Sequence, residues 1–215
     1  MANKKTSSAV ALEATPAKFK DDPEATYFFD EVAPRKRRKS ARAKAMDFPE
    51  IPEEGNLFLD EGTYKLTGPV TVPAGKTIVV PADTDVTIDF NGQTMTQDSA
   101  SLVCLFAVAG TLKFKDSTSA KAGNILRSTV SATCNAIVQL GSYGKVDGVE
   151  QPITDGATLE LNDIAIEITG NSESAKTYWA YGVNLFGKNT KFVMNSGRIS
   201  AIGPDTNIVS GNGTP

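Results

Sequence analysis

Histidine is absent from this chain of 215 residues, and cysteine and tryptophan are nearly absent. Without histidine, the chain has no Ser-His or Cys-His nucleophile pair and no His-ligated metal. Two cysteines make no disulfide framework. Both lie in apolar runs, which favours buried free thiols. No apolar stretch is long enough to cross a membrane, and the N-terminus lacks the apolar core of a secretory signal. We therefore expect neither a membrane partner nor export.

Charge is unevenly distributed along the chain, although the net charge is only −3. Residues 1–46 hold 11 Lys/Arg and 6 Asp/Glu, whereas residues 47–215 hold 11 and 19. This asymmetry indicates two parts with different partners. Residues 1–56 combine prolines, dense charge and scattered apolar residues, so they cannot bury enough surface to fold alone. We expect them to form an extended, largely irregular N-terminal attachment arm.

Two features of this arm are candidate contacts with a partner. One is an aromatic cluster, because aromatic side chains often anchor a segment on a protein surface. The other is a basic run, interpreted as a solvated charge block or as a tether to an acidic surface such as a capsid shell. Binding to nucleic acid is the third and least favoured interpretation of this run, because no nucleic-acid recognition module accompanies it. The expected contact residues are Tyr27, Phe28, Phe29, Arg35, Lys36, Arg37, Arg38, Lys39, Arg42 and Phe48.

A repeated pattern of short strands occupies the rest of the chain. Each copy has an apolar run, a turn, a strand with alternating apolar residues, and then Asp or Asn. Leu112, Leu159 and Phe192 occupy equivalent places, at intervals of 47 and 33 residues. Uneven intervals around a constant core motif are typical of a solenoid whose insertions loop out of one face. The periodicity of a helical solenoid is missing. Three short strands per copy predict an all-β parallel β-helix over residues 57–215.

An inward-facing ladder and two different ends are expected of this solenoid. Residues 57–66 would cover its first coil. The last copy begins at Ile208 and breaks off, so we expect the solenoid to continue past Pro215 or to be covered there by a partner chain. The inward ladder is predicted to contain Val86, Ile88, Leu112, Phe114, Leu159, Leu161, Phe192 and Met194.

The strands at 75–81 and 86–92, followed by Thr-Leu-x-Leu-x-Asp and Gly-Arg-Ile segments, resemble the pectate-lyase-like right-handed parallel β-helix superfamily. The likeness covers roughly residues 60–215. That superfamily includes polysaccharide lyases and hydrolases, surface adhesins, and phage tailspikes and fibres. An arm followed by a β-helix is most similar to a tailed-phage head-fibre, capsid-decoration or spike subunit. The resemblance therefore implies a virion structural protein, assembled in the host cytoplasm. It would form a homotrimer, bind capsid or tail proteins through its arm, and adhere to a host-surface glycan.

Carboxylates are the candidates for catalysis. Asp116 and Asp163 occupy equivalent places in successive copies, as paired carboxylates do in the hydrolases of the superfamily. An Asp at a coil corner more often accepts hydrogen bonds from its own backbone. The acidic set Asp83, Asp85 and Asp89 is a weaker match to a lyase calcium site. We expect no catalytic residue, metal or cofactor. The alternatives are a carbohydrate-active lyase or hydrolase and a bacterial surface adhesin.

Overall fold

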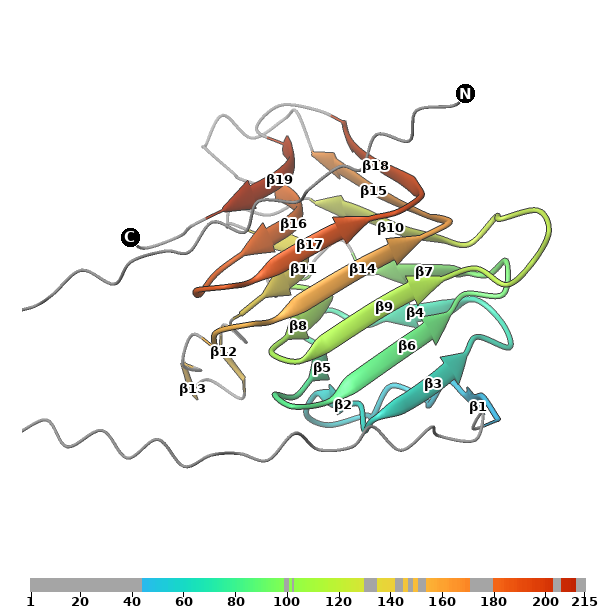
Figure 1. The fold of residues 1–215 in the computed structure, drawn as a ribbon, viewed down its shortest axis with the longest axis horizontal. Helices are drawn as coiled ribbons and strands as arrows, with labels where there is room; N and C mark the ends of the chain where they lie inside the picture. Colours follow the sequence, from blue (N-terminus) through green and yellow to red (C-terminus); the bar gives the residue numbers. More distant parts are fainter. Residues whose placement is uncertain are drawn as a thin grey trace, which may run out of the picture. The chain divides into compact units, whose positions relative to one another are not determined.

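The computed structural model describes residues 44–98, 101, 103–129, 135–141, 145–146, 149–150, 154–170, 180–202 and 206–211. Their regular structure consists of strands, with no helix (Figure 1). The described part of the chain accordingly contains no membrane-spanning helix. The predicted all-β class is confirmed for these residues.

The nineteen strands of the described residues divide among three parallel sheets and one small hairpin. Sheet 1 contains β1 (Met46–Asp47), β3 (Gly62–Lys65), β6 (Asp85–Asp89), β9 (Thr111–Lys115), β14 (Thr158–Asn162) and β17 (Lys191–Met194). Sheet 2 contains β4 (Val70–Val72), β7 (Thr94–Gln97), β10 (Asn124–Thr129), β15 (Ile164–Gly170) and β18 (Gly197–Ile202). Sheet 3 contains β2 (Leu57–Phe58), β5 (Ile78–Val80), β8 (Phe106–Val108), β11 (Asn135–Leu140), β16 (Ala180–Leu185) and β19 (Thr206–Gly211). The hairpin pairs β12 (Lys145–Val146) with β13 (Val149–Glu150).

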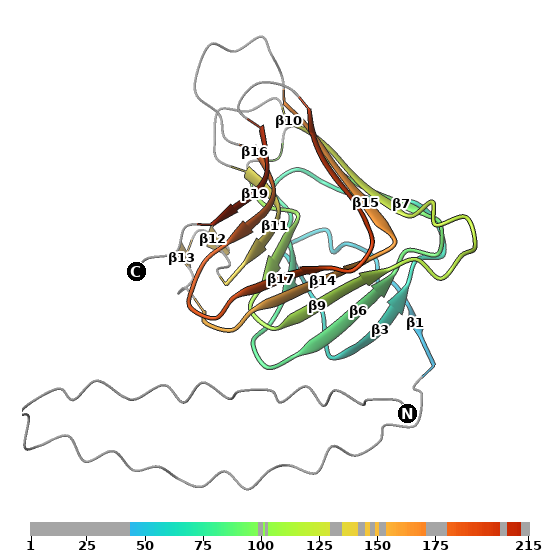
Figure 2. The same ribbon diagram turned by 45° about the horizontal axis from the view of Figure 1, so that its top comes forward.

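The chain visits the three sheets in turn, and each new strand pairs in parallel with the strand one coil earlier. This pattern holds from β3 to β19, interrupted by the β12–β13 hairpin and by β4, which begins sheet 2 and has no earlier partner among the described strands. Figure 2 shows the three sheets enclosing a common interior. Short strands that return to the same sheet after each circuit are the topology expected of a parallel β-helix.

Parallel pairing in register stacks equivalent side chains into columns. One inward column of sheet 1 contains Met46, Tyr64, Ile88, Phe114, Leu161 and Met194. A second contains Val86, Leu112, Leu159 and Phe192. The predicted ladder is therefore confirmed in its pairing. Its members on β6, β9 and β14 are buried, whereas Phe192 is half-buried and Met194 is 44% exposed. Both lie on β17, the edge strand of sheet 1.

Three phenylalanines occupy the centre of the core. The ring of Phe114 lies 5.5 Å from Phe90, nearly perpendicular to it, and 5.0 Å from Phe106. All three side chains are fully buried. Burying a side chain of this size stabilises the folded state by about 1.5–3 kcal/mol. This cluster links sheets 1 and 3, because Phe114 comes from β9 and Phe106 from β8.

The folded part begins inside the range assigned to the arm. β1 pairs with β3, and Phe48 and Ile51 pack against the core. The Phe48 ring meets the Tyr64 ring edge-on at 6.3 Å. These apolar side chains cover the first complete coil. Parallel pairing starts at Met46, whereas the solenoid was expected to start at residue 57. The tyrosine hydroxyl donates a hydrogen bond to the Asp60 carbonyl at 3.0 Å.

Candidate functional site

The stacked carboxylates Asp116 and Asp163 form the most prominent polar site in the described residues. Lys115 pairs with Asn162, so the residues that follow them stack at the corner between sheets 1 and 2. The same intervals that relate the ladder residues relate Asp116 to Asp163 and Asp163 to Ser196. Asp89 belongs to the adjacent column, which runs from Asp89 through Lys115 and Asn162. The sequence-predicted juxtaposition of Asp116 and Asp163 at one corner thus follows from the register.

Asp116 is a buried acceptor that organises the corner loop. Its Oδ1 accepts hydrogen bonds from the Gly92 amide at 3.1 Å and from the Thr118 amide and hydroxyl, both at 2.8 Å. Its Oδ2 accepts a hydrogen bond from the Gly123 amide at 2.6 Å. The residue is 2% exposed. Because Gly92 lies one coil earlier, the carboxylate connects two coils as well as two ends of one loop.

Asp163 has a different set of partners. Its backbone has a φ of 59°, a left-handed conformation that Asp tolerates better than most residues. Its Oδ1 accepts a hydrogen bond from the Ser196 hydroxyl at 2.7 Å, and its amide donates to the same oxygen of Ser196 at 2.9 Å. Its Oδ2 lies 3.1 Å from the Lys121 ammonium, which also donates to the Asp116 carbonyl. Lys121 therefore bridges the two coils.

Both corner carboxyls have lowered pKa values. For Asp116, burial alone would raise the pKa, but hydrogen bonds from Thr118, Gly123 and Gly92 outweigh it and lower the pKa. For Asp163, the hydrogen bond from Ser196 and then Lys121 lower the pKa. A general acid in a glycosidase needs a raised pKa. Both groups are instead ionised acceptors at neutral pH, and their contacts are those of a clamp that fixes successive coil corners.

The outward face of sheet 1 carries a second polar network. Lys113 lies 3.2 Å from Glu160, and Asn195 donates to Glu160 at 3.0 Å and to the Asn162 side-chain oxygen at 2.9 Å. The hydrogen bond from Lys113, followed by that from Asn162, lowers the pKa of Glu160. Each such exposed contact contributes about 0.2–1 kcal/mol to the stability of the fold. Together they connect β9, β14 and β17 across the surface.

The acidic set Asp83, Asp85 and Asp89 is dispersed by the fold. Asp83 lies in a turn with a φ of 60°, and Asp85 is exposed at the start of β6. Asp89 is 5% exposed and accepts hydrogen bonds from the amides of Asn91 and Ser117. Asp83 and Asp89 therefore serve turn and corner geometry, and Asp85 points to solvent. Over the described ranges, no three acidic, cysteine or histidine side chains gather as metal ligands would.

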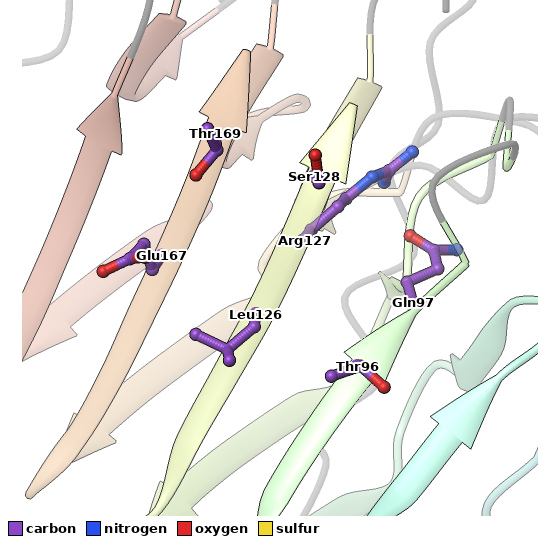
Figure 3. A pocket seen from close by; sticks show the side chains of 7 residues that line it. All are labelled: Thr96, Gln97, Leu126, Arg127, Ser128, Glu167 and Thr169. Atoms are coloured by element: carbon purple, nitrogen blue, oxygen red, sulfur yellow. The ribbon is translucent and has the colours of Figure 1, made fainter. Parts of the chain in front are cut away.

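A shallow groove lies on the outer surface of sheet 2 (Figure 3). Its volume is about 270 Å³. Strands β7, β10 and β15 supply its lining, which is mostly hydroxyl and apolar in character. The lining residues are Thr96, Gln97, Leu126, Arg127, Ser128, Glu167 and Thr169. Gln97 and Arg127 are buried, whereas Leu126 and Ser128 are exposed.

Arg127 is a buried cation that the sequence pattern did not single out. Its two terminal nitrogens donate to the carbonyls of Ala136 and Ser101, each at 3.0 Å. Burial lowers its pKa to about 10, which leaves it protonated at neutral pH. Beside it, burial raises the pKa of the Cys104 thiol to about 11. The expectation of a buried free thiol is confirmed at Cys104, while Cys134 lies outside the described residues.

Of the residues expected to contact a partner, only Phe48 is described. It packs against the core and against Tyr64, which gives it a role inside the solenoid. A partner contact at Phe48 stays a prediction. The others lie outside the described residues: Tyr27, Phe28, Phe29, Arg35, Lys36, Arg37, Arg38, Lys39 and Arg42.

The fold and its corner clamps define a class of protein, an all-β solenoid of parallel coils. Comparison with known protein families, curated proteins and solved structures finds no match to the chain.

Proposed function

We propose that this protein is a structural component of a virus particle, of the kind that forms head fibres, capsid decorations or spikes in tailed bacteriophages. In this proposal, residues 1–56 attach the chain to capsid or tail proteins. The solenoid is a right-handed parallel β-helix of the pectate-lyase-like type that projects from the particle, assembles as a homotrimer and adheres to host-surface glycan. The chain is placed in the virion after assembly in the host cytoplasm.

The observation that carries this proposal is the continuity of stacking through the solenoid. The inward column from Tyr64 to Leu161 is buried without a break, and the corners between sheets 1 and 2 are linked from coil to coil. At the corner, Asp116 reaches Gly92 in one neighbouring coil, and Lys121 reaches Asp163 in the other. A solenoid of this kind obtains length and stiffness from nearest-neighbour contacts alone. Those are the properties that a projecting spacer requires.

Co-sedimentation with particles assembled without this chain tests the attachment step. Full-length protein should sediment with the particles. A full-length variant with Tyr27, Phe28 and Phe29 all changed to Ala should stay in the supernatant, because it lacks the aromatic anchor. The matched control is Leu126→Ala, an exposed apolar residue on the side of the solenoid. Equal sedimentation of both variants would show that the aromatic cluster of the arm does not attach the chain to the particle. Failure of the unaltered chain to bind would contradict a place on the particle.

A carbohydrate-active enzyme is the second candidate, and one observation favours it. Asp163 lines a cavity of about 280 Å³ together with Lys121, Gly197 and Arg198. The two cations beside this cavity match the charge of an acidic sugar, and the carboxylate is the group that could act on it. The discriminating assay measures cleavage of acidic polysaccharides by the unaltered chain and by Asp163→Asn. We expect no cleavage by either; cleavage that disappears in Asp163→Asn would establish the enzyme instead.

A further inference from the structure

One inward column of the solenoid is open at both of its ends. The column runs through sheet 1 from Met46 to Met194. Its four middle members, Tyr64, Ile88, Phe114 and Leu161, are at most 7% exposed. The two methionines are 45% and 44% exposed. Figure 1 shows the strands that carry them, β1 and β17, at opposite ends of sheet 1.

The last described coil has the features of an unfinished stack. β17, β18 and β19 are the edge strands of their sheets, and β18 and β19 are each six residues long. The inward residues of this coil, Phe192, Ile199 and Ala201, are only partly buried. Proteins usually protect such edges with short strands, prolines or charge. The charges on these edges, Lys191 on β17 and Arg198 on β18, are of one sign. Here the side chains that would face a next coil, among them Met194, are apolar and partly uncovered.

The two ends of the solenoid carry opposite charge. The first described coil, residues 44–61, has six acidic residues and one lysine. All six carboxylates are exposed: Asp47, Glu50, Glu53, Glu54, Asp60 and Glu61. The described residues of the last coil, 187–202 and 206–211, have three basic residues and no acidic one, and Asp205 lies between these two ranges in the sequence. The basic residues are Lys188, Lys191 and Arg198, and all are exposed.

We propose that the C-terminal coil of one copy of this chain docks on the N-terminal coil of a second copy. In this contact, Met194 covers Met46 of the next copy, and the basic residues of the last coil face the acidic residues of the first. The arrangement continues the established stacking, because β17 and β1 belong to sheet 1, and β19 and β2 belong to sheet 3. Opposite charges across the contact set its orientation.

The charge distribution selects this contact over its symmetric alternatives. Two C-terminal coils facing each other would oppose Lys188, Lys191 and Arg198 with the same residues, and two N-terminal coils would oppose carboxylates. Like charges in an interface are unfavourable. A head-to-tail contact uses two different surfaces, so each dimer leaves one of each surface available. The expected product is therefore an open stack, of single copies or of the proposed homotrimer, whose length grows with protein concentration. The inference does not depend on attachment to a particle.

Sedimentation velocity of the full-length chain over a wide concentration range tests the contact. We expect the average mass to rise with concentration and to fall with added salt, because the charges are exposed. Met194→Glu should raise the dissociation constant by about tenfold or more, since it places a charge in an apolar contact. Leu126→Glu, at a comparably exposed apolar residue on the side of sheet 2, should leave the dissociation constant unchanged.

Charge reversal identifies the two surfaces that meet. Glu53→Lys with Glu54→Lys should abolish association, and Lys188→Glu with Lys191→Glu should do the same. The chain that carries all four changes should associate again, which also shows that the altered ends fold. A constant mass at all concentrations would overturn the proposal. So would association that is insensitive to Glu53→Lys with Glu54→Lys, or a fixed trimer insensitive to every end variant.

Discussion

At the scale of single residues, Asp116 is the polar side chain on which the corner most depends. Asp116→Asn puts an amide nitrogen where one carboxylate oxygen stood, and both oxygens accept hydrogen bonds from backbone amides. At least one buried donor then faces another donor. We expect a loss of about 1–3 kcal/mol in the free energy of unfolding. Urea denaturation measures it, with Asp85→Asn, an exposed residue of β6, as the control expected to change little.

The same carboxylate makes stability depend on pH in a defined direction. Hydrogen bonds hold the pKa of folded Asp116 below its ordinary value, which is about 3.9 in an unfolded chain. Its contribution is therefore fully present above pH ~4 and is lost as the pH falls through the folded pKa. We expect the difference in unfolding free energy between the unaltered chain and Asp116→Asn to narrow below pH ~4. A difference that stays constant from pH 6 to pH 2.5 would show that ionised Asp116 contributes nothing.

Substitution of Arg127 should destabilise the fold as much as substitution of Asp116, for a different reason. Arg127→Met keeps an unbranched apolar stem but leaves the carbonyls of Ser101 and Ala136 without these donors. We expect the free energy of unfolding to fall by about 1–3 kcal/mol. We also expect faster alkylation of the buried Cys104, because the region around Arg127 opens more often. Peptide mapping by mass spectrometry reports the alkylated residue. Arg198→Met, at an exposed arginine, should change neither quantity.

The sequence predicts these residues unequally, and the reason is physical. Asp116 and Asp163 are predicted because they continue the intervals of the apolar ladder. Ser196 lies one further interval along and was open to the same argument. Arg127 is different: alternation places it on the inward side of β10, where a cation is unexpected. Its burial is possible only because carbonyls from residues 101 and 136 converge on it, and local sequence does not encode that convergence.

At the scale of elements, the turn between β8 and β9 depends on a missing side chain. A Cβ at Gly110 would collide with the carbonyl oxygens of Pro81 and Thr84, which belong to the preceding coil. Gly110→Ala must push two coils apart, so we expect a cost of about 1–3 kcal/mol in the free energy of unfolding. Gly68→Ala is the matched control, because a Cβ there meets nothing within 4 Å. Similar thermal midpoints for the two variants would contradict this close approach.

The register of the strands was predictable, whereas the extent of the solenoid was not. Leu112, Leu159 and Phe192 were aligned from the sequence, and they are partners in the structure. Residues 46–51 were assigned to the arm because their prolines and charges interrupt any alternation. Phe48 and Ile51 nevertheless pack on the first coil, since an open core stabilises any apolar side chain that can reach it.

At the scale of the whole solenoid, stability should depend on depth in the stack, because each coil contacts only its neighbours. Phe114 and Met194 belong to the same inward column, but Phe114 is fully buried between rings and Met194 lies at the end. Phe114→Ala should cost about 3–5 kcal/mol, the range for a large cavity in a packed core. Met194→Ala should cost no more than about 0.5 kcal/mol, as at other exposed sites.

Urea denaturation at low protein concentration, where contacts between copies are weakest, compares these two variants directly. The contrast follows from position alone, since both side chains are large, apolar and aligned in one column. If Met194→Ala proves as costly as Phe114→Ala, another part of the chain must cover the last coil in the isolated protein. The C-terminal end would then be unavailable to a second copy, and stacking through Met194 would lose its structural basis. If the contrast holds, the exposed end is a property of the single chain and is free to dock.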